Sequence, residues 1–470
     1  MCGIVAITGT ETVAGRLVDG LKRLEYRGYD SAGIAVLAGD AMERRRARGK
    51  IVNLEALMAD APVDGPTGIA HTRWATHGKP NETNAHPHVS GKVAIVHNGI
   101  IENFRELRKD LQARGRTFES ETDSEVIAQL IDQNMAEGMD AVDAFEAALK
   151  NLSGAFAIAA IFSGKTDLLM GARKGSPLVL GYGQGEMFLG SDAIALAPLT
   201  RDVTYLEEGD WVVLTPTSHD VRNANGDRVN RPRVKSAVNE GLIERGEYDH
   251  FMLKEIHEQP ESLARSILPY IDQATLTLNL GEVADTMFAK ADRAVAIACG
   301  TAYYAANTAK YWFEQKAKLA FETDIASEFR YREPVLPQTG PAMFVSQSGE
   351  TADTLAALRY CRQNGTPAVA VVNVPESSIA REAAAIVPTY AGPEIGVAST
   401  KAFTAQLSVL AVLALNAAKA RGHLLPGDEV MAVKSLMALP RKVTEALEAQ
   451  DDIREIAKTL APCRDVLFLG

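Results

Sequence analysis

The apolar positions of residues 1–215 follow two kinds of spacing. Residues 3–8, GIVAIT, form an apolar run that predicts a buried strand, and residues 13–26 carry apolar side chains at helical spacing. Similar patterns predict strands at residues 32–39, 67–73 and 92–99, and a helix at residues 103–115 closed by Gly115. Because strands and helices mix here without a regular strand–helix repeat, we predict an α+β domain.

The pattern changes twice after residue 215. Residues 216–250 are polar and lack periodic apolar positions, so we predict a last hairpin turning at Asn225-Gly226 and then a linker. From residue 251 apolar strands alternate with long helices, which predicts a doubly wound parallel sheet over residues 251–440. The strands are expected within residues 293–300, 341–349 and 368–374, and the helices at residues 301–315, 350–365, 377–384, 399–422 and about 428–460.

The last residues form another apolar segment. Residues 464–470, RDVLFLG, predict a buried strand, and such a strand more often opens a new strand–helix unit than ends a sheet. We therefore expect residues 441–470 to begin a second, truncated repeat of the domain.

Composition and charge argue against several classes of protein, namely those that bind nucleic acid, are secreted or span a membrane. The chain has 470 residues, 46% hydrophobic and 23% charged, and a net charge of −11, which argues against a nucleic-acid surface. The four cysteines show no paired spacing, and the N-terminus has no basic region followed by a signal-like apolar run. No run approaches the ~20 uninterrupted apolar residues of a membrane span. These features predict a cytoplasmic protein without membrane or nucleic-acid partners.

Two loops of the second region follow predicted strands. Residues 346–351, SQSGET, combine hydroxyls, an amide and a glycine at a helix start, where unsatisfied N–H groups suit a phosphate. The alternative is simple helix capping by Ser348 or Thr351. Residues 299–301, CGT, repeat the strand–turn–helix arrangement, with a plain tight turn as the alternative.

The stretch 346–354, SQSGETADT, resembles the phosphosugar-binding sugar isomerase domain. Residues 394–403, EIGVASTKAF, are similar to the segment that follows the sugar site in the glutamine–fructose-6-phosphate aminotransferase family, although Ser399 would also suit a helix cap. The resemblance implies sugar-phosphate binding by Gly300, Thr301, Ser346, Gln347, Ser348, Thr351 and Ser399.

The first region holds candidates for the release of ammonia from glutamine. Cys2 either begins a buried strand or, after removal of Met1, is a nucleophile whose own α-amine acts as base. Arg73 suits a carboxylate bidentately, although most arginines are surface charges. Asn98-Gly99 is a common hairpin dipeptide, and such a turn would direct the Asn98 amide and the Gly99 N–H at an oxyanion.

Asp123 lies in the sequence Thr122-Asp123-Ser124-Glu125. This fits a capping box with Thr122 as the cap and Glu125 reaching back. Asp123 then either favours the helix dipole or holds a ligand ammonium, and at a helix start both roles are compatible.

Together with residues 1–7 and 26–33, these segments resemble the N-terminal-nucleophile glutaminase domain over residues 1–215. The resemblance implies an αββα sandwich, with Cys2 as nucleophile and Asn98 and Gly99 stabilising the oxyanion. It also implies a glutamine site in which each charged group of the substrate has a partner. The implied glutamine-binding residues are Arg73, Trp74, Thr76, His77 and Asp123, with Trp74 as a gate.

The two halves together are identified as a member of the glutamine–fructose-6-phosphate aminotransferase family. Membership implies conversion of fructose 6-phosphate and L-glutamine to glucosamine 6-phosphate and glutamate, the first step of the hexosamine pathway. It implies no metal or organic cofactor and a homodimer in the full-length form. The histidine spacings between residues 71 and 97 match no zinc pattern.

Two departures from the family pattern change the expectation. Position 302 is Ala where the family usually has Ser, which removes one phosphate hydroxyl. The second sugar isomerase repeat, with its acid–base groups, is not in this chain, so we expect the chain as given to hydrolyse glutamine and to make little amino sugar.

Three alternative functions stay open on the sequence. Another amidotransferase would need an SGGxDS nucleotide loop or a ribose-phosphate acidic loop, and neither is found. A glutaminase-coupled deaminase or isomerase acting on another phosphosugar would share both halves. A non-catalytic phosphosugar sensor would carry a DNA-binding helix-turn-helix in place of the glutaminase half.

Overall fold

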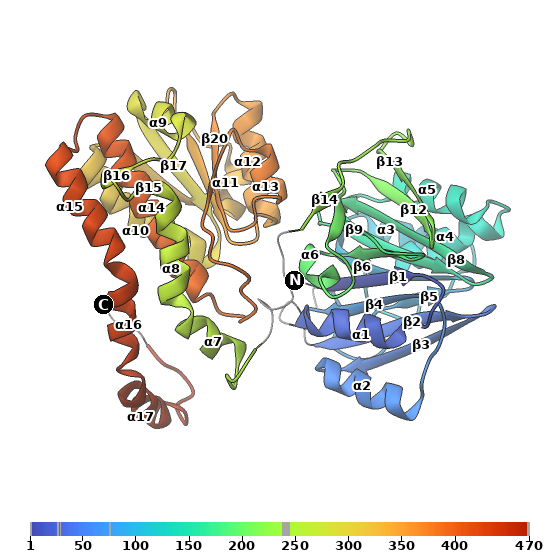
Figure 1. Ribbon diagram of the computed structural model, residues 1–470. Helices are drawn as coiled ribbons and strands as arrows, with labels where there is room; N and C mark the ends of the chain where they lie inside the picture. The colour runs from blue at the N-terminus through green and yellow to red at the C-terminus, as the bar shows by residue number, and fades with distance from the viewer. Residues whose placement is uncertain (1, 26–27, 29, 75–76, 237–244, 468–470) are drawn as a thin grey trace. The chain divides into compact units, whose positions relative to one another are not determined.

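The computed structural model describes residues 2–25, 28, 30–74, 77–236 and 245–467 (Figure 1). The chain divides into two compact parts, here called the N-terminal unit (residues 1–244) and the C-terminal unit (residues 245–470). Each has its own hydrophobic clusters.

The N-terminal unit contains two antiparallel sheets. The eight-stranded sheet has the order β14 (Val234–Lys235), β11 (Asp202–Tyr205), β9 (Val179–Tyr182), β10 (Met187–Gly190), β1 (Gly3–Thr8), β4 (Thr67–Arg73), β2 (Ser31–Ala38) and β3 (Ala41–Arg48). The six-stranded sheet has the order β13 (Ser218–Arg222), β12 (Trp211–Thr215), β8 (Lys165–Lys174), β7 (Gly154–Phe162), β6 (Val93–Ile101) and β5 (His88–Ser90).

Helices cover the outer face of each sheet (Figure 1). The eight-stranded sheet carries α1 (Ala14–Lys22), α2 (Ile51–Asp60) and α6 (Ala193–Leu196). The six-stranded sheet carries α3 (Phe104–Ala113), α4 (Glu125–Ala136) and α5 (Ala141–Asn151).

Strand β1 is apolar on both faces because each face packs in a hydrophobic cluster. Val5 and Ile7 pack in the cluster under α1, whereas Ile4 and Ala6 pack between the two sheets, and all four are fully buried. A strand covered on both sides loses the usual alternation of apolar and polar residues. The predicted αββα sandwich is confirmed.

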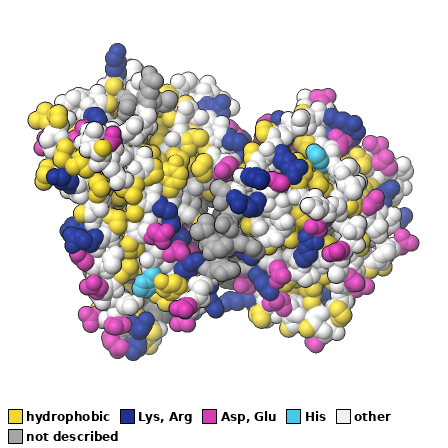
Figure 2. Space-filling model, viewed as in Figure 1, with side chains coloured by type: hydrophobic (Ala, Val, Ile, Leu, Met, Phe, Trp, Pro, Cys, Tyr) yellow, Lys and Arg dark blue, Asp and Glu magenta, His cyan; other side chains and the backbone are white. Residues whose placement is uncertain are grey.

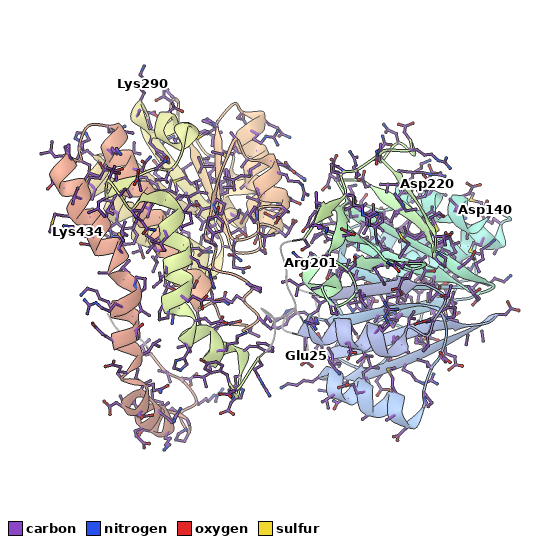
Figure 3. The ribbon with its side chains drawn as sticks, viewed as in Figure 1. Glu25, Asp140, Arg201, Asp220, Lys290 and Lys434 are labelled. Atoms are coloured by element: carbon purple, nitrogen blue, oxygen red, sulfur yellow. The ribbon has the colours of Figure 1, made fainter. Side chains whose placement is uncertain are left out.

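Polar side chains complete the helix starts of this unit. The labelled Asp140 is the N-cap of α5, and its Oδ1 accepts from the N–H groups of Val142 and Asp143 at 2.8 and 2.9 Å (Figure 3). The labelled Glu25 receives the Ile51 N–H at the start of α2 at 2.7 Å. Both contacts satisfy donors that a helix leaves open at its first turn.

The polar segment 216–250 differs from its predicted description. Asn225-Gly226 does form a turn, since Gly226 N donates to Asn223 O at 2.9 Å. Val229 N donates to Val221 O at 2.8 Å across this turn, as the predicted hairpin requires. Beyond the hairpin, β14 pairs with β11, so the sheet extends to Lys235, within the segment expected to be a linker. The strand pairing, which no local pattern reveals, decides this boundary.

The C-terminal unit is built on a five-stranded parallel sheet. Its order is β18 (Ala320–Ile325), β17 (Arg293–Ala298), β19 (Ala342–Ser346), β20 (Ala368–Val372) and β21 (Ala385–Pro388). The strand order reverses between β17 and β19, and ligands of such sheets bind at the carboxyl ends of strands beside this switch point. A small hairpin of β15 (Ile271–Asp272) and β16 (Thr277–Leu278) completes the strands described here.

Helices cover both faces of this sheet (Figure 1). One face carries α8 (Gln259–Ile267), α9 (Glu282–Ala289), α10 (Gly300–Trp312) and α14 (Lys401–Ala420), and α7 (Phe251–His257) precedes them. The other face carries α11 (Ala326–Arg332), α12 (Ala352–Gln363) and α13 (Ser378–Glu382).

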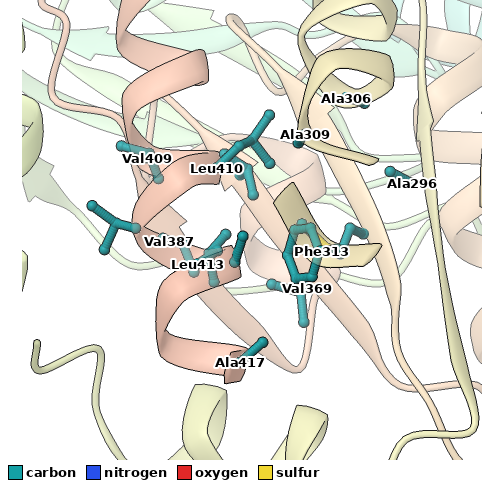
Figure 4. Packing of buried hydrophobic residues seen from close by; sticks show 14 of the residues in the cluster. Ala296, Ala306, Ala309, Phe313, Val369, Val387, Val409, Leu410, Leu413 and Ala417 are labelled. Carbon is teal, nitrogen blue, oxygen red and sulfur yellow. The ribbon is translucent and has the colours of Figure 1, made fainter. Parts of the chain in front are cut away.

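The larger core of the C-terminal unit forms around α14. Val409, Leu410 and Leu413 of that helix pack against Phe313 and Val369, all at 0% exposure (Figure 4). Helix α14 is long and apolar enough to cross a membrane by length and composition, and 72% of its most apolar window is buried within this unit.

The end of the described chain differs from its prediction in two ways. The helix expected at about 428–460 is three helices, α15 (Pro426–Met437), α16 (Leu439–Leu447) and α17 (Gln450–Leu460). Pro440 starts α16 because proline fits the first turn of a helix but not its interior. Residues 464–467 form no strand, and residues 468–470 lie outside the described part of the chain.

Charged side chains of both signs are interspersed over the visible face of each unit (Figure 2). The net charge of −11 gives an anion no long-range attraction to the protein. Any anionic ligand must therefore find its donors locally, within a site.

Candidate active site

Cys2 lies at the start of β1 and beside the end of β4. The register pairs Gly3 with Thr72, so the residues just outside these strands, Cys2 and Trp74, meet. The Trp74 N–H donates to the Cys2 sulfur at 3.2 Å, and the sulfur lies 3.5 Å from Trp74 O. The sheet itself, rather than a loop, therefore sets the position of the thiol.

Burial raises the pKa of the Cys2 thiol above its ordinary value. The Trp74 N–H lowers the pKa but does not cancel the effect of burial. The thiol is therefore protonated at neutral pH, and it needs a base before it can act as a nucleophile.

Asn98 extends from β6 in the other sheet and reaches the same residue. Its Nδ2 donates to the Cys2 backbone O at 3.1 Å, and Asn98 is 9% exposed. The predicted hairpin turn at Asn98-Gly99 is wrong, because both residues lie inside β6 and pair with Ala157 and Phe156 of β7. A strand partner on that side outweighs the turn preference of the dipeptide.

Gly99 is required where it stands. Its φ is 135°, and a Cβ at this position would lie 1.9 Å from the Ala155 backbone O. Only glycine permits both the backbone angle and the close approach of the next strand. The absence of a side chain at residue 99 therefore allows the backbone conformation next to Asn98.

Arg73 ends β4 and is 3% exposed. Its guanidinium donates to three consecutive backbone carbonyls, those of His77, Gly78 and Lys79, and lies 3.7 Å from Asp30 Oδ1. Among the described residues Asp30 is the one carboxylate near this buried guanidinium, at the limit of an ion pair, so Arg73 keeps strong attraction for another anion.

Asp123 is 2% exposed and stands just before α4. Its Oδ2 accepts the Ile101 N–H at 2.8 Å, and its Oδ1 faces His77 Nδ1 at 3.9 Å. A buried carboxylate with one face toward His77 suits a cationic group. Thr76, the remaining predicted member of the glutamine site, lies outside the described residues.

The predicted capping box at residues 122–125 is wrong. The N-cap of α4 is Ser124, without a side-chain hydrogen bond to the helix. Glu125 instead accepts the N–H groups of Glu119 and Ser120 at 2.9 and 2.6 Å, so its carboxylate holds the preceding loop. The spacing fits a capping box, but contacts with this loop decide the role.

Four histidines, His71, His86, His88 and His97, are buried close to Asn98. Burial lowers the pKa of each, that of His71 to about 3, so all four are neutral at physiological pH. No group of three or more His, Cys, Asp or Glu side chains in the described residues has an arrangement that would hold a metal ion. The spacing of these histidines predicted no zinc site and a turn near the glutaminase site at residues 86–88, but it gave no sign of the contact between His71 and Asn98.

The two predicted phosphate loops follow the neighbouring strands β17 and β19 of the C-terminal unit. Ser346 Oγ accepts the Gly349 N–H at 3.0 Å and lies 3.2 Å from Thr351 Oγ1, and Ser348 Oγ accepts the Glu350 N–H at 3.2 Å. Thr351 is the N-cap of α12 but makes no side-chain cap bond. These hydroxyls thus shape the loop itself and do not cap the helix in the expected way.

A glycine in each of the two predicted phosphate loops adopts a backbone angle that other residues rarely adopt. Gly300 has a φ of 58° at the first turn of α10, and Gly349 has a φ of 64°. A Cβ on Gly349 would lie 1.9 Å from Ser377 Oγ. The loop after β20 therefore packs directly against the loop after β19. Gln347 lies on the loop after β19, whereas Thr301 and the buried Ala302 lie in the first turn of α10.

Ser399 has a different partner from the one expected. Its Oγ donates to Glu394 Oε2 at 3.1 Å, and Glu394 also receives the N–H groups of Thr400 and Ala402 at 2.8 and 3.0 Å. The alternative role of Ser399 as a helix cap is not realised, because the N-cap of α14 is Thr400. Sequence reasoning missed Glu394, whose role becomes visible only when α14 is folded.

Comparisons with known proteins agree with this arrangement. A glutamine amidotransferase domain family matches residues 71–198, and a SIS domain family matches residues 287–416. A glutamine–fructose-6-phosphate aminotransferase of Bradyrhizobium diazoefficiens is 55% identical over the whole chain, which covers 77% of that protein. The protein of the same name from Caulobacter vibrioides is 56% identical at the same coverage.

The chain belongs to the glutamine–fructose-6-phosphate aminotransferase family.

A solved C-terminal domain of a glucosamine-fructose-6-phosphate aminotransferase from Francisella tularensis is also similar. The two share 39% sequence identity, the match covers 46% of this chain and 61% of the solved chain, and the TM-score is 0.45. The predicted family is confirmed by the curated aminotransferases, and the pairing of amidotransferase and sugar isomerase domains by the family matches.

Proposed function

We propose that this protein acts in the cytoplasm in the amination of fructose 6-phosphate by L-glutamine, which gives glucosamine 6-phosphate and glutamate, and that residues 1–470 supply the glutaminase half and the first sugar isomerase domain of that reaction. The observation that carries the proposal is the convergence of the Cys2 thiol, the Trp74 N–H and the Asn98 amide. Relatives named for this reaction match the full chain, and they are bacterial metabolic enzymes.

The proposed reaction at Cys2 begins with removal of Met1. The freed α-amine takes the thiol proton, and Sγ attacks the side-chain amide carbon of glutamine. The oxyanion that forms is stabilised by Asn98 Nδ2 and the Gly99 N–H. Collapse breaks the C–N bond, the protonated amine donates to the leaving ammonia, and a γ-glutamyl thioester remains for water to hydrolyse to glutamate.

Glutamine recognition follows from the two buried charges. Arg73 would bind the substrate carboxylate by turning donors away from the carbonyls of residues 77–79, which it now holds. Asp123 would bind the ammonium with the oxygen that faces His77. Trp74, 45% exposed and next to the thiol, is placed to cover the bound amide.

Sugar-phosphate binding is proposed for the loops after β17 and β19. The N-termini of α10 and α12 begin in these loops, and their open N–H groups attract a phosphate without a lysine or arginine. The residues proposed to contact the sugar phosphate are Gly300, Thr301, Ser346, Gln347, Ser348, Thr351 and Ser399.

The test is a set of cysteine variants assayed for glutamate release. Cys2→Ala should lower glutamine hydrolysis by at least about 10³-fold, and Cys2→Ser should lose most of it because a hydroxyl is far less ionisable than a thiol. Cys463→Ala, at an exposed cysteine, is the matched control and should match the parent. Mass spectrometry should show that active protein lacks Met1; full activity with Met1 retained would refute the mechanism.

A further inference from the structure

His71 and Asn98 meet in the layer between the two sheets of the N-terminal unit. Ile69, two residues before His71 on β4, and Val96, two residues before Asn98 on β6, both pack in the cluster between the sheets. Residues two apart on a strand share a face, so His71 and Asn98 face each other across this layer. His71 is 0% exposed.

The contacts of His71 determine which ring nitrogen carries the proton. Its Nε2 lies 3.0 Å from Asn98 Oδ1 and 3.1 Å from the His97 backbone O. A carbonyl oxygen accepts only, so Nε2 carries the hydrogen, and it donates toward both oxygens. The other nitrogen, Nδ1, is buried and has no hydrogen-bond partner among the described residues.

A charged ring would be poorly tolerated at this position. An imidazolium would place a second N–H at Nδ1, where no described acceptor meets it, and an unpaired buried donor is costly. Burial also lowers the pKa of His71 to about 3. His71 is therefore a neutral donor with one defined tautomer throughout the physiological range.

This donor acts on the far end of the amide that reaches Cys2. Asn98 Oδ1 faces His71, and Asn98 Nδ2 consequently points the other way, to Cys2 O at 3.1 Å. Rotation of the amide by half a turn would place an NH₂ group against the His71 N–H and an oxygen against Cys2 O. Both contacts would then be repulsive.

We propose that His71 is a positioning residue that fixes the orientation of the Asn98 amide, so that Nδ2 stays directed at Cys2 and at the oxyanion that forms there. The inference rests on the proposed role of Asn98 as an oxyanion donor. His71 touches neither substrate nor nucleophile and acts only through Asn98.

Packing holds the His71 ring in place on its other side. The His86 ring lies 4.0 Å from it between centroids, tilted by 35°, and the His88 ring lies 4.6 Å beyond. His86 can approach because residue 33 is glycine, since a Cβ there would lie 2.1 Å from His86 O. The ring thus has few other orientations open to it.

The experiment compares three single variants in the full chain. His71→Leu removes the donor and should lower kcat for glutamine hydrolysis about 10- to 100-fold, with KM for glutamine changed less than about threefold, since only the transition state uses the donor. His71→Gln keeps an N–H near the position of Nε2 and should recover most of kcat. Ile69→Ala, on the same face of β4, controls for loss of core packing and should leave kcat near that of the parent.

A double-mutant cycle separates positioning from a general defect. His71→Leu added to Asn98→Ala should cause little further loss, because the amide it orients is absent. An equal loss in both backgrounds, or no recovery with His71→Gln while the protein stays folded, would overturn the inference. If Asn98→Ala alone leaves kcat unchanged, the proposed oxyanion role of Asn98 is wrong, and the inference about His71 is wrong with it. If Asn98→Ala lowers kcat and the losses from Asn98→Ala and His71→Leu are additive in the double variant, only the inference about His71 is wrong.

Discussion

The two units hold their candidate sites in different ways. In the N-terminal unit the side chains that meet lie on or next to strands, with Cys2 before β1, Arg73 on β4 and Asn98 on β6. In the C-terminal unit the polar groups lie in loops after β17 and β19, where α10 and α12 begin. Covalent chemistry needs a few atoms held closely in place, whereas a phosphate is bound by many equivalent donors.

The difference extends to what surrounds each site. His71 and Asn98 are enclosed between two sheets, so each polar atom depends on a specific partner. Ser346 contacts Thr351, and the hydroxyls of Ser346 and Ser348 accept N–H groups of their own loop. The first arrangement should respond sharply to single changes, and the second more gradually.

The strongest test of this comparison is at Gly99. Gly99→Ala would place a Cβ 1.9 Å from Ala155 O at a φ of 135°, so it should cost about 3 kcal/mol or more of stability and at least about 10²-fold in glutamine hydrolysis. Urea unfolding and glutamate release measure the two effects.

Gly115→Ala is the matched control for Gly99→Ala. Gly115 also has a positive φ, 88°, but nothing lies within 4 Å of an added Cβ. It should cost only about 1 kcal/mol and leave hydrolysis unchanged. Similar losses for both variants would show that backbone angle alone, rather than the neighbouring strand, makes Gly99 necessary.

The glutamine clamp should show the next largest effect. Arg73→Ala and Asp123→Ala each remove one charged partner of the proposed substrate and should raise KM for glutamine by about 30-fold or more, equivalent to about 2 kcal/mol. Arg73→Lys should fall between the parent and Arg73→Ala, because an ammonium cannot bind in a bidentate fork. Steady-state kinetics measure this, with Arg114→Ala, an exposed arginine paired with Glu137, as the control.

The phosphate loop should respond less to one change. Ser346→Ala removes the acceptor for the Gly349 N–H and should weaken fructose 6-phosphate binding by about 5- to 30-fold, equivalent to about 1–2 kcal/mol. Calorimetry on the full chain measures the binding, and glutamine hydrolysis should stay at the parent rate. Ser435→Ala, at an exposed serine that bonds only its own helix, is the control; unchanged sugar-phosphate affinity in Ser346→Ala would contradict the loop assignment.

The smallest expected effect is the pH dependence of stability that arises from the buried His71. Burial lowers the pKa of His71 to about 3, below its ordinary value of 6.5, so between these values the unfolded chain binds a proton that the folded chain does not. Stability therefore falls as pH drops below 6.5, by about 1 kcal/mol per pH unit for this histidine.

Urea unfolding at pH 7.5, 6.5 and 5.5 measures this slope. A Trp312→Phe background leaves Trp74 and Trp211 as reporters, both in the N-terminal unit. His71→Gln should reduce the slope between pH 6.5 and 5.5 by about 1 kcal/mol per pH unit. An unchanged slope in His71→Gln would mean that His71 takes up a proton while folded.

The family and the fold class of both units could be predicted because motif segments such as residues 1–7 and 346–354 carry the resemblance and the strand–helix pattern carries the fold. Asn98-Gly99 was placed in a turn because that dipeptide favours one, but β7 lies alongside and makes it a strand. The contact of His71 with Asn98 joins two sheets across 27 positions of sequence, and no spacing rule indicates it. The one available signal was a histidine at an inward position of an apolar strand.

The carboxylate of Glu394 has an electrical consequence for the C-terminal unit. It sits on the N–H groups at the start of α14 and also receives the Ser399 hydroxyl, so the protein fills the positive end of this helix with an anion of its own. If a phosphate binds at the starts of α10 and α12 as proposed, the start of α14 would not compete for it, because Glu394 already occupies that position. The proposed phosphate site would then have one rival fewer within this unit.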